Sequence, residues 1–211
     1  MKIDEPSICA LLIVASESAF LQLSGVPILL RSFETLRRAL PARTIYVGST
    51  SENADRVCDL LDTREGEYEL LFCNPQEPKS IAASLLPFLR GYDSVVVHDA
   101  SRPLVDDHQF ERVFSAFTGE IDAVRPWMVI SETLKILSPT SEILDTVDRS
   151  TVKWVSTPEL YKISSIDWEG ANCGWFLPLK TGVQIELVEG NAESVRINTA
   201  ADRDLQQLLL E

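Results

Sequence analysis

The stretch Asp93-Ser-Val-Val-Val-His-Asp-Ala-Ser-Arg-Pro-Leu-Val105 decides the fold of this chain. Its three consecutive valines, Val95 to Val97, are β-branched residues that suit a strand buried on both faces and suit a helix poorly. Polar residues follow the valines at once, beginning with His98 and Asp99 and continuing to Arg102. We therefore interpret the stretch as the central strand of an α/β sheet that ends in a polar loop.

Asp99 and Arg102 are candidate site residues because of where this loop falls. In an open α/β sheet, ligands bind outside the carboxyl ends of the strands, so a carboxylate and a guanidinium at that edge point to a functional site. A structural explanation stands beside this one. Asp99 can instead cap the next helix and pair with Arg102, as polar loop residues often do.

Apolar runs and helical patterns alternate through the first half of the chain. The run from Ile8 to Val14 predicts the first buried strand, and Pro27 is well placed to begin a helix with Ile28, Phe33, Leu36 and Leu40 on its inward face. Further strands are predicted at 43–47, 68–73 and 121–124, and further helices at 52–62, from Pro78 onward, and at 106–118. This alternation, at intervals of roughly 25 to 30 residues, is typical of a doubly wound, mostly parallel α/β sheet.

The pattern changes at Ser131. Two alternating segments, Glu132–Leu137 and Glu142–Val147, flank the turn Ser138-Pro-Thr-Ser141, which predicts a β-hairpin arm at about 131–149. Because an isolated hairpin is only marginally stable in water, we expect the arm to pack on its own domain or on a second copy of the chain.

The last part of the chain carries weaker patterns. We expect a short strand at 152–155, a helix that begins at Pro158, a loop at 167–179, and strands at 183–188 and 195–198. Thr199 is a suitable cap for a final helix over about 200–210.

Composition limits the class of protein. The chain has 211 residues, of which 45% are hydrophobic, and we expect a single domain over 1–211. Its 32 acidic and 19 basic residues give a formal net charge of −13, so a general nucleic-acid-binding surface is not expected. Any phosphate must be held by a few local basic groups.

Cysteine usage and the amino-terminal residues indicate the compartment. The four cysteines form no Cys-x-x-Cys pair, and Cys9 and Cys73 lie in apolar runs that suit buried free thiols, which favours a reducing cytoplasm. The first apolar run is too short to cross a bilayer, and Asp4 and Glu5 precede it where a signal peptide would carry basic residues. We expect neither a membrane partner nor a targeting segment.

Five segments in order resemble the 2-C-methyl-D-erythritol 4-phosphate cytidylyltransferase family. They are His98-Asp-Ala-Ser-Arg-Pro103, Glu132-Thr-Leu-Lys135, Thr146-Val-Asp-Arg149, Trp154-Val-Ser-Thr-Pro158 and Arg196-Ile-Asn-Thr199. The resemblance implies a Rossmann-like fold of the nucleotide-diphospho-sugar transferase type. It also implies transfer of a cytidylyl group from CTP to a sugar-alcohol phosphate, with Mg²⁺, in isoprenoid precursor synthesis.

The resemblance implies a role for Asp99, Arg102 and Arg196 at the phosphates. Asp99 and Arg102 match the family's groups that face the phosphates and the acceptor, and the carboxylate is suited to Mg²⁺ or to a hydroxyl contact. Arg196 stands where the family keeps a lysine, so the positive charge is kept while the donor geometry differs. On the nucleotide side, Ser80 matches a serine near the cytosine base, and Ala15 is expected to contact the bound nucleotide.

Three further residues match positions that contact the acceptor phosphate in the family, some of them across a dimer interface: Thr133, Arg149 and Thr157. The resemblance therefore implies a homodimer formed through the hairpin arm. For the threonines the alternative is an ordinary strand residue. For Arg149 it is a surface ion pair with Asp145 or Asp148.

One region departs from the family. Where the family carries a glycine-rich loop with an arginine and a later lysine, Val14–Gly25 has no glycine before Gly25, no lysine and no arginine, and it places Glu17 where phosphate would sit. Three hypotheses follow. The chain is a weakened cytidylyltransferase, a non-catalytic homologue that binds a sugar phosphate or acts as a regulatory partner subunit, or a nucleotidyltransferase with another donor or acceptor.

Overall fold

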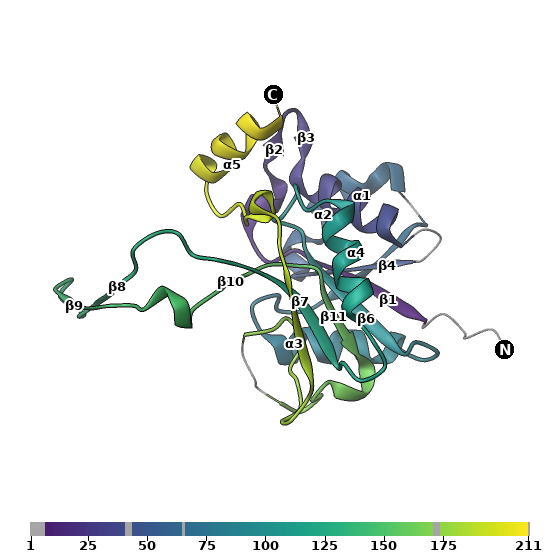
Figure 1. Ribbon diagram of the computed structural model, residues 1–211. Helices are drawn as coiled ribbons and strands as arrows, with labels where there is room; N and C mark the ends of the chain where they lie inside the picture. Colours follow the sequence, from purple (N-terminus) through teal and green to yellow (C-terminus); the bar gives the residue numbers. More distant parts are fainter. Residues whose placement is uncertain (1–6, 41–43, 65, 171–173, 211) are drawn as a thin grey trace.

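An eight-stranded sheet forms the centre of the protein. The computed structural model describes residues 7–40, 44–64, 66–170 and 174–210 (Figure 1). Seven strands lie in the order β10-β7-β11-β6-β1-β4-β5, and β12 also pairs with β7. Their bounds are β1 Ile8–Ile13, β4 Ile45–Ser49, β5 Tyr68–Phe72, β6 Ser94–Asp99, β7 Ala123–Met128, β10 Trp154–Val155, β11 Glu159–Lys162 and β12 Ile185–Glu189.

The sheet is mostly parallel, which confirms the predicted fold class. β1 lies between β4 and β6 and is parallel to both, β5 extends this parallel set, and β12 is parallel to β7. β11 is antiparallel to both β6 and β7, and β10 is antiparallel to β7. The carboxyl ends of β1 and β6 therefore meet the amino end of β11 at one edge of the sheet.

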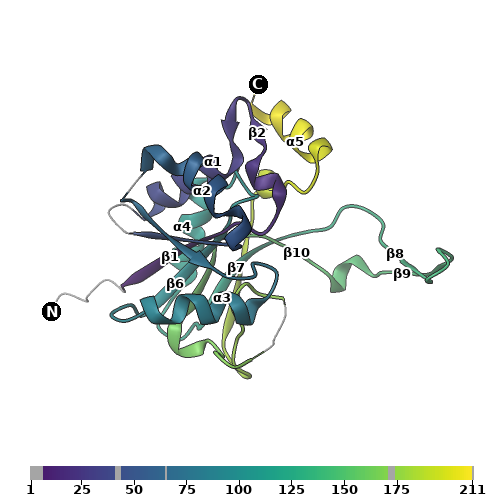
Figure 2. The same ribbon diagram turned by 180° about the vertical axis from the view of Figure 1, so that it is seen from behind.

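Helices cover both faces of the sheet (Figures 1 and 2). One apolar core joins the sheet to α1 (Ile28–Ala39), α2 (Ala54–Leu61) and α4 (Asp107–Ala116), and a second joins it to α3 (Pro78–Leu85) and to residues near 177–179. Within β6, Val96 faces the first core while Val95 and Val97 face the second. This alternation explains the uninterrupted valine run, because both faces of the strand are buried.

The remaining elements are short apart from α5 (Ala200–Gln207), which Thr199 and Asp202 begin with a capping box. β2 (Gln22–Leu23) and β3 (Val26–Pro27) form a small ribbon. Single 3₁₀ turns occupy Glu17–Phe20, Ser51–Asn53, Asp62–Arg64, Leu86–Phe88, Arg149–Thr151, Ile163–Ser165, Ala192–Ser194 and Leu208–Leu210.

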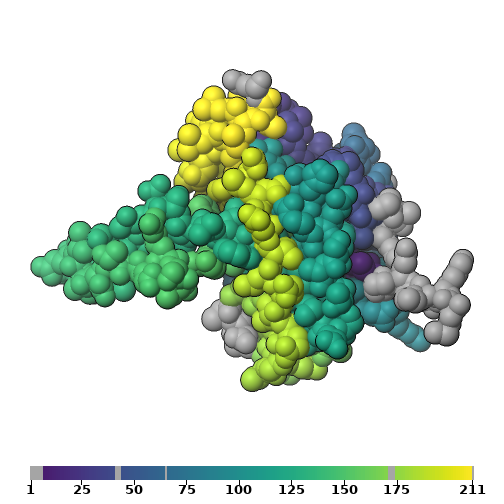
Figure 3. All heavy atoms as spheres, in the orientation of Figure 1, coloured from purple at the N-terminus to yellow at the C-terminus, as the bar shows by residue number. Residues whose placement is uncertain are grey.

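The hairpin arm projects from the body of the protein (Figure 3). β8 (Lys135–Leu137) and β9 (Ile143–Thr146) pair as antiparallel strands, as the sequence predicts. The arm exposes the apolar side chains of Ile136, Leu137, Ile143 and Leu144. In a single chain, the arm leaves these side chains in contact with water.

Two predicted elements are wrong. Pro158 begins no helix, because the residues after it form β11, and pairing with β6 and β7 on both sides outweighs the local helix-start signal. Residues 195–198 form no strand. Instead, the Ile197 amide donates to the Ser101 carbonyl at 2.9 Å, so the segment is tied to the loop after β6 and joins no ladder.

Other expectations are met or lie outside the described residues. Cys9, Cys58 and Cys73 are free thiols, with Cys9 buried and Cys73 half-buried, whereas Cys173 and the start of the strand expected at 43–47 fall outside the described ranges. Among the residues described, no helix is both long enough and apolar enough to cross a membrane.

The core predicts the effect of a cavity-forming substitution. Leu12 is fully buried in β1, so Leu12→Ala should lower the free energy of unfolding by about 2–5 kcal/mol. Leu205 is 67% exposed on α5, so Leu205→Ala should change the free energy of unfolding by less than about 0.5 kcal/mol. Urea denaturation of the two variants measures the difference, and equal losses would contradict the assigned position of β1.

Candidate functional site

Asp99 is the last residue of β6 and forms the centre of the candidate site. Its side chain is 2% exposed, and its Oδ1 accepts a hydrogen bond from the Ser101 amide at 2.9 Å. Its Oδ2 lies 3.0 Å from Nε of Arg196 and 3.7 Å from Nε of Arg102. A buried carboxylate requires partners of this kind, because an unpaired buried charge is strongly destabilising. The predicted pairing of Asp99 with Arg102 is therefore present, and Arg196 joins it.

Arg102 has a mainly structural position. Its Nη1 donates to the Ser194 carbonyl at 2.6 Å and to the Ser156 hydroxyl at 3.2 Å, and its Nη2 donates to the Val155 carbonyl at 3.2 Å. Burial lowers the pKa of the Arg102 guanidinium, and Asp99 opposes that change. Because these contacts join the loop after β6 to β10 and to the segment before Arg196, Arg102 fixes the geometry of the site.

Arg196 is the more accessible cation. Its side chain is 27% exposed, and it lines a cavity while holding the Asp99 carboxylate. A partly exposed guanidinium that is oriented by a buried carboxylate can accept an anion without rearrangement.

Thr157 connects Asp99 to a buried histidine. The Thr157 hydroxyl accepts a hydrogen bond from the Asp99 amide at 3.3 Å and lies 2.9 Å from Nδ1 of His98. Burial lowers the pKa of His98 to about 3, so the imidazole is neutral at ordinary pH. The hydroxyl of Thr157 thus points into the protein, toward β6.

Serine hydroxyls occupy the segment between β1 and β2. Ser16 lies 2.9 Å from the Ser101 hydroxyl, and Ser18 donates to the Ile197 carbonyl at 2.5 Å. Glu17 is exposed and pairs with Arg56 of α2 at 2.7 Å, so its carboxylate is held by a cation at the protein surface. The segment is tied closely to the loop that carries Arg196.

A cavity of about 410 Å³ opens beside Arg196 at the same edge of the sheet. Its wall combines aromatic and aliphatic side chains with a few polar groups: Ala15, Pro75, Gln76, Pro78, Ile81, Arg125, Glu159, Gly174, Trp175, Phe176 and Arg196. Nε2 of Gln76 donates to the Ala15 carbonyl, which joins two segments of the cavity wall. A concave, partly aromatic cavity with a few convergent polar groups is typical of a small-molecule site.

The predicted nucleotide-side residues lie differently with respect to this cavity. Ala15 lines it, directly after β1. Ser80 lies in the first turn of α3, next to Ile81, and its hydroxyl accepts a hydrogen bond from the Asn74 amide at 2.8 Å. Ser80 therefore stabilises the loop 74–78, from which Pro75, Gln76 and Pro78 face the cavity.

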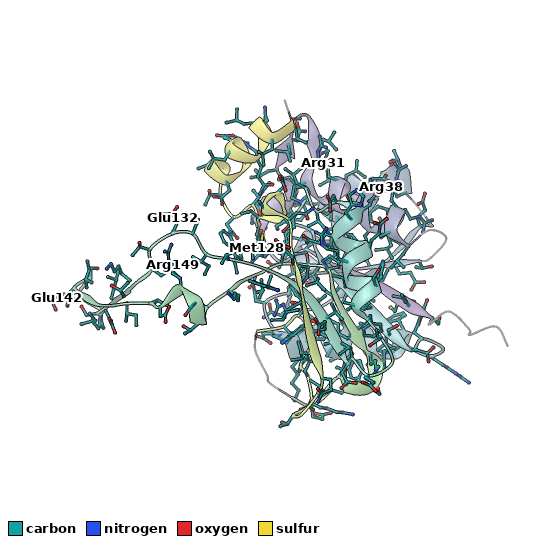
Figure 4. All side chains as sticks on the ribbon, viewed as in Figure 1. Arg31, Arg38, Met128, Glu132, Glu142 and Arg149 are labelled. Carbon is teal, nitrogen blue, oxygen red and sulfur yellow. The ribbon has the colours of Figure 1, made fainter. Side chains whose placement is uncertain are left out.

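Thr133 and Arg149 lie on the arm and are separated from the Asp99 cluster of the same chain. Figure 4 labels Arg149 and Glu132 on the arm, whereas Met128 marks the strand from which the arm leaves the body. The side chains of Thr133 and Arg149 are exposed, and Arg149 donates to the Ser131 carbonyl within the arm. The fold therefore brings together Asp99, Arg102, Thr157 and Arg196, and it presents Thr133 and Arg149 elsewhere.

Several cavity residues escaped the sequence analysis, above all Arg125, Glu159 and Trp175. Arg125 and Glu159 lie on β7 and β11, and their side chains pair at 2.5 Å although both are buried. The sequence offered one signal for this pair, a charged residue within each of two otherwise apolar segments. Burial of such a charge is destabilising unless the two opposite charges meet.

Asp99 fits a magnesium ion poorly as a direct ligand. Its two oxygens already accept from an amide and face two guanidiniums, and a second carboxylate is missing from its described neighbours. No group of three or more metal-ligating side chains occurs in the part of the chain that the structure describes. Mg²⁺ is commonly held by one or two carboxylates together with substrate phosphates, so these residues alone do not form such a site.

Comparison with known proteins gives a family match over nearly the whole chain. The family model described as "IspD: 2-C-methyl-D-erythritol 4-phosphate cytidylyltransferase" matches residues 12–211. The cytidylyltransferase of Bacteroides fragilis is 27% identical over 201 residues, covering 90% of each chain. A "Bifunctional enzyme IspD/IspF" of Clavibacter michiganensis is 27% identical over 194 residues, covering 87% of this chain and 47% of that protein. The chain thus spans about half the length of such bifunctional relatives.

Solved structures share the fold. The 4-diphosphocytidyl-2C-methyl-D-erythritol synthase of Anaerococcus prevotii matches with a TM-score of 0.74 at 17% identity, covering 97% of this chain and 98% of that one. The cytidylyltransferase structure from Thermus thermophilus matches with a TM-score of 0.69 at 21% identity, covering 95% and 98%. At these identities the structures support the fold.

The neutral state of His98 predicts a pH dependence of stability. An unfolded histidine titrates near 6.5, whereas folded His98 titrates near 3, so the unfolded state binds more protons between these values. The free energy of unfolding should therefore fall as pH drops through this window, by up to about 1.4 kcal/mol per pH unit from this group.

The measurement is urea denaturation between pH 7 and about 4. His98→Gln should lack this part of the slope, while His108→Gln, at an exposed position on α4, should keep it. Parallel curves for the wild type and His98→Gln would contradict the assigned burial.

Proposed function

Because the chain belongs to the 2-C-methyl-D-erythritol 4-phosphate cytidylyltransferase family, we propose that it transfers a cytidylyl group from CTP to 2-C-methyl-D-erythritol 4-phosphate. The observation that carries the proposal is the position of Arg196. This guanidinium pairs with Asp99 and also lines the cavity, so a base in the cavity would have its phosphates beside a fixed cation.

The proposed roles follow from burial. Arg196 binds the phosphates of CTP, since it is the partly exposed member of the cluster, and Asp99 orients it. Arg102 and Thr157 act as positioning residues, because Arg102 bonds to Ser156 and to Val155 of β10, and the Thr157 hydroxyl contacts His98 and the Asp99 amide in β6. Ala15 and the loop 74–78, which Ser80 stabilises, hold the nucleoside.

In the proposed reaction, a phosphate oxygen of the acceptor attacks the α-phosphorus of CTP, and pyrophosphate leaves. Negative charge grows on the leaving pyrophosphate, where a fixed guanidinium lowers the barrier. Mg²⁺ would enter bound to the triphosphate and would neutralise part of its charge. The proposed roles of Asp99 and the arginines do not involve this ion.

We propose that turnover is slow. The segment after β1 supplies serine hydroxyls where the resemblance leads one to expect glycine amides and cations, and its hydroxyls already bond to Ser101 and Ile197. Loss of a single preorganised donor commonly costs about 10²–10³ in rate. Arg56, the cation of α2 that the segment contacts, is paired with Glu17.

A second candidate function is a non-catalytic homologue that binds a sugar phosphate or acts as a partner subunit. The same serine-bearing segment favours it, because a donor-poor loop weakens catalysis more than it weakens binding of the acceptor. Calorimetry with CTP and Mg²⁺ separates the two candidates. Binding of CTP together with pyrophosphate release supports the enzyme, and binding of the sugar phosphate without CTP supports the alternative.

Substitution of Arg196 should reduce activity while the protein stays folded, because Arg102 and the Ser101 amide still face the Asp99 carboxylate. Arg196→Met is expected to lower kcat/KM about 10²–10³-fold, because it removes one preorganised cation. Arg203→Met, a control on α5 where Arg203 pairs with Asp204, should leave kcat/KM nearly unchanged. Pyrophosphate release with CTP and the sugar phosphate is the assay, and equal rates for the two variants would exclude the proposed role of Arg196.

We also propose a homodimer formed through the arm, which would bring Thr133 and Arg149 of one chain to the Asp99 cluster of the other. Two observations support it. The arm exposes apolar side chains that a partner would cover, and Arg149 makes no described ion pair of its own. A guanidinium free of acidic partners is suited to bind an acceptor phosphate.

Mixing experiments test the shared site. Arg149→Met and Arg196→Met should each be nearly inactive alone, whereas a mixture of equal parts should recover up to about a quarter of wild-type activity, as one intact site forms in each mixed dimer. Sedimentation should show a dimer at micromolar concentration. A stable monomer, or a mixture with no recovery, would overturn the arm-mediated dimer.

A further inference from the structure

A buried ion pair forms the floor of the cavity. Nη2 of Arg125 lies 2.5 Å from Oε1 of Glu159, and the two side chains are 11% and 0% exposed. Burial raises the pKa of Glu159, an effect that Arg125 opposes. The Tyr161 hydroxyl donates to the other carboxylate oxygen, Oε2, so both oxygens of Glu159 have a neighbour.

The same pair holds one wall of the cavity. Nη1 of Arg125 donates to the Gly174 carbonyl, and Oε2 of Glu159 accepts from the Phe176 amide at 2.9 Å. Between these two attachments lies Trp175, whose ring lies 4.4 Å from the Arg125 guanidinium carbon and 5.6 Å from the Tyr161 ring. Gly174–Phe176 is thus fixed at both ends and at its centre.

We infer that Arg125 is a positioning residue that holds Trp175 as a fixed aromatic wall for a planar ring, the nucleobase of the substrate. The inference rests on the proposed function and assigns a residue to it. The guanidinium bonds to Glu159, bonds to Gly174 and lies by the indole at the same time, which a planar fork of donors allows and an ammonium group does not.

A planar ring fits this part of the cavity better than a phosphate does. The positive charge of Arg125 is matched by Glu159, so the floor offers no net charge to an anion. Around it stand Trp175, Phe176, Pro75, Pro78 and Ile81, which favour an aromatic ring. Arg196, at the rim by Asp99, is left for the phosphates.

Calorimetry with cytidine tests the inference without phosphates or catalysis. Arg125→Met should weaken cytidine binding about tenfold, since the wall loses its central attachment. Arg112→Met is the matched control, because Arg112 also bonds to a backbone carbonyl, that of Glu189, but lies on α4 outside the cavity. It should bind cytidine like the wild type.

Two further variants separate positioning from charge and from folding. Arg125→Lys keeps the charge beside Glu159 but loses the fork, so it should bind cytidine weakly as well. If Arg125→Met fails to fold because Glu159 is left unpaired, the double variant Arg125→Met with Glu159→Met removes both charges and should fold yet still bind weakly.

Kinetics supply the second readout. In Arg125→Lys, KM for CTP should rise about tenfold while KM for the sugar phosphate stays unchanged. Cytidine binding equal to the wild type in both Arg125→Lys and the double variant overturns the inference, as does a wild type that binds no cytidine. If the Arg125 variants bind cytidine weakly but the wild type shows no turnover, the inference is supported and the proposed enzyme function is refuted.

Discussion

The site depends on the burial of one carboxylate. Asp99 ends the central strand with its side chain out of water, and a buried charge without partners is strongly destabilising. Its oxygens contact the Ser101 amide and the guanidiniums of Arg102 and Arg196. Arg102 and Arg196 are separated by most of the second half of the chain. The loop at 194–197 therefore packs against the carboxyl end of β6, and it carries the accessible cation with it.

A second buried pair extends the same principle to the neighbouring strands. Arg125 and Glu159 meet between β7 and β11, so the cavity has one ion pair in its floor and another at its rim. In a chain with a formal net charge of −13, anionic substrates are repelled by most of the surface. A rim that carries Arg196 gives such a substrate a local point of attraction.

The periodicity of the sequence is enough to predict the parallel part of the sheet and its helices, because β1, β4, β5 and β6 each carry an apolar pattern of their own. β11 escaped prediction, since a four-residue strand after a proline has no clear local signal and is formed by pairing on both sides. In the site, Asp99 and Arg102 follow from their place after the central strand. Arg125 and Trp175 do not, because Arg125 meets Glu159 and Trp175 only where segments that are distant in sequence come together.

The segment after β1 keeps its place in the fold through serine hydroxyls. Its hydroxyls bond to Ser101 and to the Ile197 carbonyl, and these contacts hold the end of β1 against the loop of Arg196 without glycine or cations. Structure at this position therefore does not require the donors that catalysis requires. Neutral hydroxyls stabilise developing negative charge less than fixed cations do, which is the physical basis of the slow turnover that we propose. Under either proposed function the protein must still bind its ligand, and the cavity beside Arg196 is the part of the fold that offers a place for it.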